Sequence, residues 1–189
     1  MTTISVIVGS LRRESINLKL AKALIKLAAE HHSPYHFKLV EIAGLPLYNE
    51  DLWENVPAAV TTFKATLKES AGLLFVSPEY NRTISSPLKN ALDWGSRPPT
   101  DNSWGHKPAA MLGASTGQIG TAVAQSHLRS VLPILNIQLM GQPEVYLKFE
   151  DGLINERYEI TNDKTKVFLQ KFLTQFEQFL KSSLGSVKY

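Results

Sequence analysis

The sequence predicts an α/β protein in which parallel strands and helices alternate, and three observations lead to this prediction. Short, continuously apolar runs recur along the chain, as in strands that are buried on both faces. Each run is followed by a stretch with apolar residues at helical spacing. The 189 residues hold five such pairs, which suits the flavodoxin-like doubly wound fold better than the larger six-stranded dinucleotide-binding fold. We therefore expect a single domain over residues 1–189, with a five-stranded parallel sheet and helices on both faces.

The elements are predicted in an order that alternates strand and helix. Residues 4–8 form a β-branched run that ends at Gly9-Ser10, which is typical of a buried strand. Leucine and alanine at helical spacing predict a helix over residues 15–29, and Pro34 ends that region. The other strands are predicted over residues 37–42, 71–77, 109–114 and 137–140. The other helices are predicted over residues 58–70, 88–94, 119–132 and 161–184.

The loop after the first strand reads GSLRRESIN, over residues 9–17. It leads into a helix, whose first turn offers unpaired N–H groups and the positive end of the helix dipole. Ser10, Ser15 and Asn17 add short polar side chains and Arg12 adds a guanidinium, which favours the binding of one phosphate monoester. The loop has neither the G-x-x-x-x-G-K of an ATP-binding loop nor the G-x-G-x-x-G of a dinucleotide fold. The alternative is that Ser15 only caps the helix and the arginines are solvated.

The loop after the third strand reads SPEYNRTISS, over residues 77–86. Pro78 stiffens the exit from the strand, and Glu79, Tyr80 and Asn81 follow it at the edge of the sheet. Their backbone N–H groups are fixed donors of the kind that suits the edge of a planar heterocycle, on which Tyr80 would stack. A simple capped turn is the alternative.

Two further features belong to the same edge of the predicted sheet. Ser85 or Ser86 is predicted to cap the next helix, with Pro87 at its first position. The loop after the fourth strand, GASTGQ over residues 113–118, is small and flexible, so that a flat ring can approach its backbone closely. An ordinary strand-to-helix turn is the alternative for this loop.

The composition excludes several classes of chemistry. The chain has no cysteine, so any redox chemistry depends on a bound cofactor, and neither a disulfide nor a thiolate metal site is possible. The net charge is +3 without a block of Lys and Arg, so we expect no nucleic-acid partner. No apolar run is long enough for a signal peptide or a membrane span, so we expect no membrane partner and a cytoplasmic location. No metal site is expected, because Pro34 interrupts the helical spacing of His32 and His36.

Three stretches resemble the signature regions of the NADPH-dependent FMN reductase family, which includes bacterial chromate and quinone reductases. They read GSLRRESINLKLAKAL, SPEYNRTISSPLKNALDW and GASTGQIGTAVAQSHLRSVL, and the likeness spans roughly residues 4–144. The combination of GSLR-x-x-S-x-N with PEYN and LKNALDW is specific. The chain departs from the family pattern at Ser85-Ser86, where members often have Pro-Gly, and it lacks an arginine before Ala124-Gln125.

The resemblance implies a flavodoxin-like subunit that binds FMN non-covalently and uses NADPH or NADH as co-substrate. It implies that FMN carries the chemistry and that no side chain is itself catalytic. The implied FMN-binding residues are Ser10, Leu11, Arg12, Ser15, Asn17, Pro78, Glu79, Tyr80, Asn81, Ser115, Thr116 and Gly117. Members commonly form homodimers or homotetramers, and residues 127–144 would contribute to such a contact.

The expected function is therefore that of an NAD(P)H-dependent reductase. Electrons would pass from the nicotinamide through bound FMN to a small-molecule acceptor: a quinone, a nitro or azo compound, or a metal oxyanion such as chromate. One alternative is a non-enzymatic electron carrier or redox sensor, although carriers tend to be strongly acidic and this chain has a net charge of +3. Another is a phosphate-binding regulator in which Arg12 and Arg13 hold a phosphorylated ligand without redox chemistry.

Overall fold

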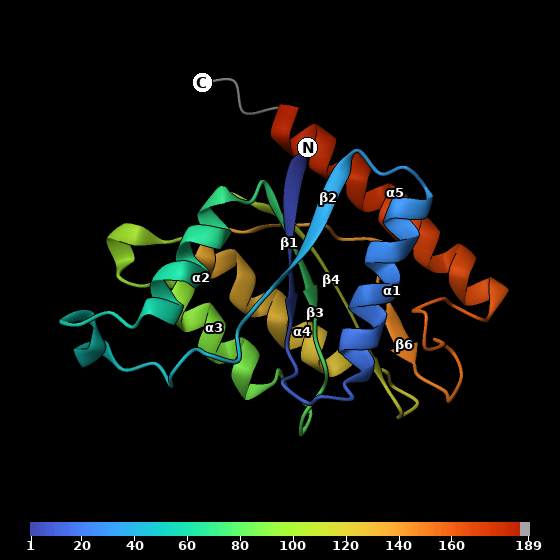
Figure 1. Cartoon of the computed structure of the whole chain (residues 1–189), viewed down its shortest axis with the longest axis horizontal. Coiled ribbons are helices and arrows are strands. Elements are labelled where there is room, and N and C mark those ends of the chain that lie inside the picture. The colour runs from blue at the N-terminus through green and yellow to red at the C-terminus, as the bar shows by residue number, and fades with distance from the viewer. Residues whose placement is uncertain (186–189) are drawn as a thin grey trace.

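The computed structural model describes residues 1–185 and contains a parallel sheet between two layers of helices (Figure 1). The strands are β1 (Thr2–Val8), β2 (Tyr35–Val40), β3 (Gly72–Val76), β4 (Pro108–Ser115), β5 (Gln138–Leu139) and β6 (Tyr146–Lys148). The α-helices are α1 (Ile16–Glu30), α2 (Ala58–Glu69), α3 (Ser86–Ser96), α4 (Ala122–Val131) and α5 (Asp163–Gly185). The strand order is β2-β1-β3-β4-β5 and these strands pair in parallel, which is the flavodoxin-like order. The predicted fold class is therefore confirmed.

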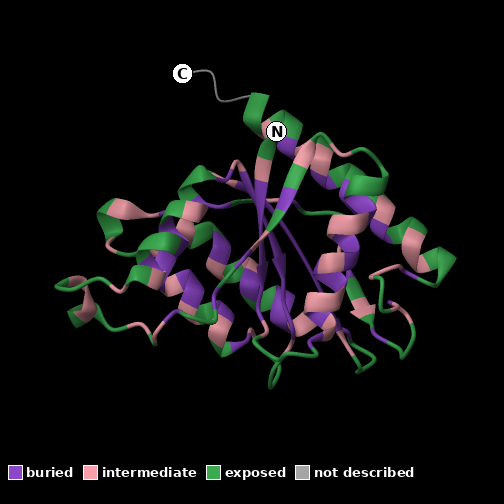
Figure 2. Ribbon diagram, viewed as in Figure 1, coloured by how far each residue is buried: buried purple, intermediate pink, exposed green. Residues whose placement is uncertain are grey.

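The sheet separates two apolar cores, because successive residues of a strand face opposite sides. Val6 of β1 is buried in the core beneath α1 and α5, and its neighbour Ile7 is buried in the core beneath α2, α3 and α4. Figure 2 shows the central strands as buried along almost their whole length. This double coverage explains why the central strands β3 and β4 are almost continuously apolar in sequence, whereas the edge strand β2 alternates polar and apolar residues.

The predicted fifth strand is shorter in the structure, and a sixth strand that was not predicted follows it. β5 has only two residues and pairs with the start of β4 at Pro108 and Ala109. The chain then leaves the sheet edge and returns as β6, which pairs in parallel with the end of β4 at Gly113 to Ser115. The prediction of one strand over residues 137–140 missed this break. Its cause is local, since Gly141 and Pro143 lie between the two pieces and Pro143 has no N–H for a ladder hydrogen bond.

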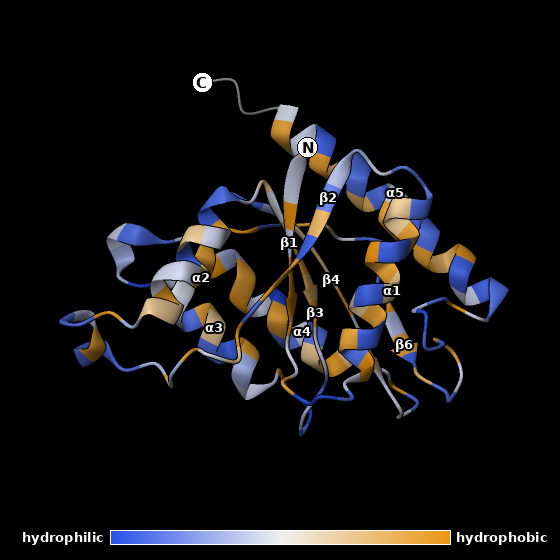
Figure 3. Ribbon diagram, in the orientation of Figure 1, coloured by the Kyte–Doolittle hydropathy of each residue, from blue (hydrophilic) through white to orange (hydrophobic). Residues whose placement is uncertain are grey.

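Polar and apolar residues are segregated between the outside and the inside of the molecule. Figure 3 shows apolar residues along the strands and polar residues on the outward faces of the helices and in many of the loops. Within residues 1–185, no helix combines the length and the hydropathy that crossing a membrane requires.

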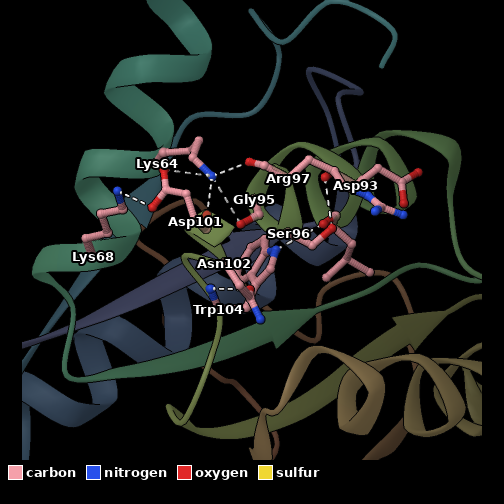
Figure 4. A network of polar contacts seen from close by, with 10 residues as sticks. Lys64, Lys68, Asp93, Gly95, Ser96, Arg97, Asp101, Asn102 and Trp104 are labelled. Carbon is pink, nitrogen blue, oxygen red and sulfur yellow. Dashed lines mark hydrogen bonds and ion pairs between the residues drawn. The ribbon is translucent and has the colours of Figure 1, made fainter. Parts of the chain in front are cut away.

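The segment between α3 and β4 is held by a buried lysine on α2, although the sequence predicts only a long loop here. Lys64 is 6 % exposed, and its Nζ donates hydrogen bonds to the carbonyl oxygens of Arg97 at 2.5 Å and Asp101 at 2.7 Å (Figure 4). The carboxylate of Asp101 lies 3.6 Å from the same nitrogen, and Lys68 binds this carboxylate from the outside at 2.6 Å. Burial lowers the pKa of Lys64, and Asp101 opposes this effect.

Replacing Lys64 with methionine is expected to lower the free energy of unfolding by about 2–3 kcal/mol, because the carbonyl groups of residues 97 and 101 lose a charged donor. Lys68→Met is the matched control: Lys68 binds the same carboxylate, but its side chain is 52 % exposed, so its loss should cost less than about 1 kcal/mol. Urea unfolding measures both changes. Equal destabilisation by the two variants would show that burial of the Lys64 ammonium adds nothing.

Candidate functional site

Three loops leave the sheet at the carboxyl ends of β1, β3 and β4, side by side. Val8 pairs with Val76, and Val76 pairs with Leu112, so the three strands end at nearly the same level. Residues 9–15, 77–85 and 116–121 continue from these ends, at the lower edge in Figure 1. β1 and β3 are neighbours although they are not consecutive in sequence, and strand order reverses at β1, which is where open α/β sheets bind ligands.

The β1–α1 loop presents free amide groups around the start of α1. Ser15 is the N-cap residue, and its hydroxyl accepts a hydrogen bond from the N–H of Leu18 at 3.2 Å. Among the described residues, no protein group accepts a hydrogen bond from the backbone N–H of Leu11, Arg13 or Glu14. Arg12 is exposed, and no acidic group among residues 1–185 pairs with its guanidinium. The loop therefore offers amide donors, a guanidinium and a helix N-terminus to an anion.

Asn17 has a different position from the one expected for a ligand of the phosphate. Its side chain is buried and binds both backbone groups of Ala114, donating to the carbonyl oxygen and accepting from the N–H, each at 2.9 Å. This pair of bonds attaches the first turn of α1 to β4. Asn17 therefore fixes the position of the loop, in contrast to the expectation that its amide is free to bind the phosphate.

The β3–α3 loop contains a two-residue hairpin turn that the sequence did not reveal. Tyr80 and Thr83 exchange two backbone hydrogen bonds of 3.0 Å, and Asn81 and Arg82 between them have φ angles of 50° and 62°. Both central residues of such a turn need left-handed φ values, which Asn tolerates and Arg adopts only under constraint. The hairpin directs Tyr80 towards the β1–α1 loop, where its hydroxyl lies 3.3 Å from Oγ of Ser10.

The exits of β1 and β3 are packed directly against each other. Ser85 occupies the N-cap position of α3, but its hydroxyl donates to the carbonyl oxygen of Gly9 and makes no capping bond, contrary to the prediction for this residue. Pro78 is buried in the same contact, and a Cβ on Gly9 would lie 3.0 Å from its Cδ. Since this distance is shorter than an ordinary contact, only glycine fits at position 9 without a shift of the loops.

Glu79 connects the β3–α3 loop to the start of α4. Its carboxylate accepts hydrogen bonds from the N–H groups of Val123 and Ala124, each at 3.0 Å, and binds the guanidinium of Arg82 at 2.9 Å. Burial would raise the pKa of Glu79, but the hydrogen bonds from Ala124, Arg82 and Val123 outweigh it and lower the pKa. Sequence reasoning expected backbone contacts from Glu79 and missed this brace, because the partners lie 44 and 45 residues away.

We expect Glu79→Gln to loosen the first turn of α4 and the hairpin, and to lower the free energy of unfolding by about 1–2 kcal/mol at neutral pH. A carboxyl group whose pKa is lower in the folded chain stabilises the fold above its ordinary value of 4.5, and this contribution is lost as the pH falls through the folded value. The difference in stability between wild type and variant should therefore be largest above pH 4.5 and shrink at more acidic pH. Urea unfolding at a series of pH values measures it, with the exposed Glu150→Gln as control. A difference that does not depend on pH would contradict the role of the charge.

The β4–α4 loop is the third wall of the site. α4 begins at Ala122, later than predicted, because residues 117–120 form a turn in which Gly120 has a φ of +61°. Oγ of Ser115 accepts a hydrogen bond from the N–H of Gly117 at 3.0 Å, and Thr116 is exposed. No protein group within residues 1–185 accepts from the N–H of Thr116 or Gln118, so this loop also offers amide donors.

The three loops share a property that suits a planar, phosphorylated heterocycle. Each exposes one large apolar side chain: Leu11 is 51 %, Tyr80 45 % and Ile119 46 % exposed. Each also carries backbone N–H groups without a protein acceptor among the described residues. Exposed apolar groups beside fixed polar donors are the usual walls of a site for a flat ring with polar edges. The residues present therefore fit a flavin mononucleotide.

A hollow adjoins the hairpin on the side of α3 and α4. Its volume is about 810 Å³, and Leu47, Ile84 and Val131 are among the residues that line it. His127 on α4 also borders it, and Nδ1 of His127 lies 2.9 Å from Oγ1 of Thr83 in the hairpin. The hollow is therefore apolar for most of its wall and adjoins the loop that carries Tyr80.

Comparisons with known proteins agree with this site. The family model described as NADPH-dependent FMN reductase matches residues 2–151. A 2-hydroxy-1,4-benzoquinone reductase of Burkholderia is 46% identical over 178 residues, which are 94% of this chain and 96% of that protein. An NAD(P)H-dependent FMN reductase of Pseudomonas aeruginosa is 37% identical, with 94% of both chains covered. The solved structure of FerB, a flavoenzyme NAD(P)H:acceptor oxidoreductase of Paracoccus denitrificans, superimposes with a TM-score of 0.92 at 39% identity and covers 97% of this chain and 99% of that one.

The family model covers most of the chain, and these relatives are similar over nearly their whole length. Their agreement favours the reductase over the non-enzymatic carrier that the sequence left open. The chain therefore belongs to the NADPH-dependent FMN reductase family, and it is an FMN-containing oxidoreductase that uses NAD(P)H.

Proposed function

We propose that this enzyme is an NAD(P)H-dependent quinone reductase with a single FMN-binding domain over residues 1–189. The observation that carries the proposal is the meeting of three loops at the point where strand order reverses, each with an exposed apolar side chain and free amide donors. Relatives named as quinone reductases support the choice of acceptor. Nitro and azo compounds and chromate are further acceptors that we propose for the same open site.

The β1–α1 loop would hold the phosphate of FMN. Ser10 and Arg12 provide a hydroxyl and a guanidinium, and Leu11 and its neighbours provide amide donors at the N-terminus of α1. Ser15 would contribute through its cap of the helix, and Asn17 through its attachment of that turn to β4. The phosphate would therefore be recognised by a preorganised loop, which costs little ordering free energy on binding.

The other two loops would hold the flavin ring. Pro78, Glu79 and Asn81 would present their backbone along its edge, while the Glu79 carboxylate keeps the loop attached to α4. Tyr80 would cover the ring from the hairpin, and Ser115, Thr116 and Gly117 would face it from the opposite loop. Bound FMN supplies the hydride and electron transfer in this enzyme. The role of the protein is to position the flavin ring, to donate hydrogen bonds to its edge and to leave one face open.

The apolar hollow beside the hairpin would admit the ring of the acceptor. Leu47, Ile84 and Val131 give it apolar walls and His127 a polar edge, which suits a quinone. We also propose that the enzyme is a homodimer or a homotetramer, in keeping with the exposed apolar side chains of Leu47 and Ile134, which are 82 % and 81 % exposed. Sedimentation of the FMN-loaded protein measures the oligomeric state.

The test is reconstitution with FMN followed by anaerobic reduction. Oxidation of NADPH and of NADH is followed with 1,4-benzoquinone, chromate, a nitroaromatic and an azo dye as acceptors. We expect rapid bleaching of the flavin by a reduced dinucleotide and reoxidation by the quinone. A flavin that neither dinucleotide reduces would overturn the proposed function. Reoxidation by the other acceptors but not by the quinone would overturn the proposed acceptor.

A further inference from the structure

A second hollow lies on the other side of the β1–α1 loop, between the ends of β1 and β2. Its volume is about 400 Å³. Apolar side chains of Leu11, Leu18, Leu39 and Ile42 line it, and no residue of the β3 or β4 loops does. Since β2 and β3 lie on opposite sides of β1 in the sheet, this hollow and the proposed flavin site flank the same loop.

Three charged residues line this hollow: Arg12 and Arg13 of the β1–α1 loop, and Glu41 after β2. Arg13 is exposed, and its guanidinium has no partner among residues 1–185. Glu41 follows the last residue of β2, and its Oε1 accepts a hydrogen bond from the N–H of Ala43 at 2.6 Å. The second oxygen of this carboxylate has no partner among the described residues. The hollow thus has apolar walls, the guanidinium groups of Arg12 and Arg13, and a carboxylate that is held in place by one of its oxygens.

This combination matches the chemistry of an adenosine that carries a ribose phosphate. A purine ring suits apolar walls, and a guanidinium binds a phosphate through paired, charge-assisted hydrogen bonds. An acidic residue at the end of the second strand binds ribose hydroxyls in doubly wound folds, whereas a nearby arginine accommodates a 2′-phosphate. Both groups are present here. The two nucleotides of a dinucleotide are joined by a pyrophosphate, so its two heterocycles can occupy adjacent hollows on either side of one loop.

We propose that the hollow between β1 and β2 binds the adenosine end of the reduced dinucleotide, with Arg13 on the 2′-phosphate of NADPH and Glu41 on the ribose hydroxyls of NADH. The proposal rests on the proposed reductase function, since it needs a dinucleotide as electron donor. Arg12 lines the same hollow; the proposal assigns Arg12 to the flavin phosphate and Arg13 to the co-substrate. The balance between Arg13 and Glu41 then decides which dinucleotide is preferred.

The proposal predicts changes of opposite direction in two variants of the FMN-loaded enzyme. Arg13→Ala should raise the KM for NADPH by roughly 10- to 100-fold, the range for loss of a charged hydrogen bond, and leave the KM for NADH within about twofold. Glu41→Gln should raise the KM for NADH several-fold, by about 3- to 10-fold. The same variant should leave the KM for NADPH unchanged or lower it, because a negative charge near the phosphate is removed. The kcat should stay near the wild-type value in both variants, since neither side chain is proposed to contact the flavin.

A binding measurement that does not depend on turnover uses two probes. Adenosine 2′,5′-bisphosphate and adenosine 5′-monophosphate are titrated into the FMN-loaded protein in a calorimeter. We expect the bisphosphate to bind wild-type protein more tightly than the monophosphate, and Arg13→Ala to remove most of that difference. Arg157→Ala is the matched control, because Arg157 is an exposed arginine in the segment between β6 and α5 and does not line the hollow.

Three results would overturn the inference, and each is distinct from failure of the proposed function. The first is an unchanged KM for NADPH in Arg13→Ala protein that still binds FMN. The second is an equal effect of Arg157→Ala. The third is displacement of FMN by the bisphosphate, which would assign the hollow to the flavin phosphate. The proposed function itself fails only if no dinucleotide reduces the bound flavin, whatever residue stands at position 13.

Discussion

Replacing Gly113 with alanine is expected to lower the free energy of unfolding by about 3 kcal/mol and to weaken the binding of FMN. Gly113 lies in β4 where the exits of β3 and β4 pack against the start of α4. A Cβ at this position would overlap the carbonyl oxygen of Ser77 and the side chain of Thr121. The first of these is a backbone atom at the end of β3, so it cannot move unless the β3–α3 loop moves too. That loop carries the residues proposed to hold the flavin ring, so stability and cofactor binding should fall together.

Gly117→Ala is the matched control for this prediction. Gly117 lies in the loop that follows the same strand, and a Cβ there would only make an ordinary contact of 3.4 Å with Oγ of Ser115. Its replacement should therefore change the stability by less than about 1 kcal/mol. Urea unfolding and fluorescence titration with FMN measure the two effects. If the Gly113 and Gly117 variants unfold at the same urea concentration, then the close packing of the ends of β3 and β4 against the start of α4 does not contribute to stability.

Replacing Arg12 and Ser15 together with alanine is expected to raise the Kd for FMN by roughly 10- to 150-fold, which corresponds to the loss of a charge-assisted hydrogen bond of about 1.5–3 kcal/mol. The phosphate of FMN would lose the guanidinium of Arg12 as a hydrogen-bond donor. The hydroxyl of Ser15 caps the N-terminus of α1 through Leu18, so its loss would also loosen the turn whose amides face the phosphate. Titration of apoprotein with FMN measures the affinity.

Riboflavin provides the control, because it has the same ring and no phosphate. Its Kd should be nearly the same for the wild type and for the single variant Arg12→Ala. The single variant Ser15→Ala separates the effect of the helix cap, and its unfolding free energy should be lower by about 1 kcal/mol. FMN binding that is unaffected in the double variant would refute the assignment of residues 9–17 to the phosphate.

The sequence was informative wherever the pattern is local. The period of the apolar residues reports whether a segment is a strand or a helix, and this period predicted the elements of the fold to within a few residues. It failed at the fifth strand, where a two-residue pairing and a break at Pro143 carry too weak a periodic signal. It also placed the start of α4 too early, because Gly117 and Gly120 form a turn within what reads as an amphipathic helix.

The candidate site was predictable as three loops but not in its internal contacts. Glu79 could be assigned to the edge of the sheet from its place after β3, yet its carboxylate accepts hydrogen bonds from the first turn of α4. Asn17 reads as a phosphate ligand beside the helix start, yet its amide is used by Ala114, 97 residues away. Lys64 reads as one more cation of an amphipathic helix, and its burial depends on carbonyl groups 33 and 37 residues along the chain. None of these contacts can be predicted from the neighbouring residues in the sequence.

The sequence by itself determined the order of strands and helices, the double coverage of the sheet and the three loops that carry the flavin signature. These features depend on which residues are apolar and how they are spaced, so they can be read one segment at a time. Only the tertiary structure decided that Arg12, Arg13 and Glu41 line one hollow, that the side chains of Glu79 and Asn17 connect elements of the fold, and that a short β5 is followed by a separate β6. The physical reason is that a polar side chain takes its role from the groups that folding brings within hydrogen-bond distance, and those groups come from distant parts of the chain.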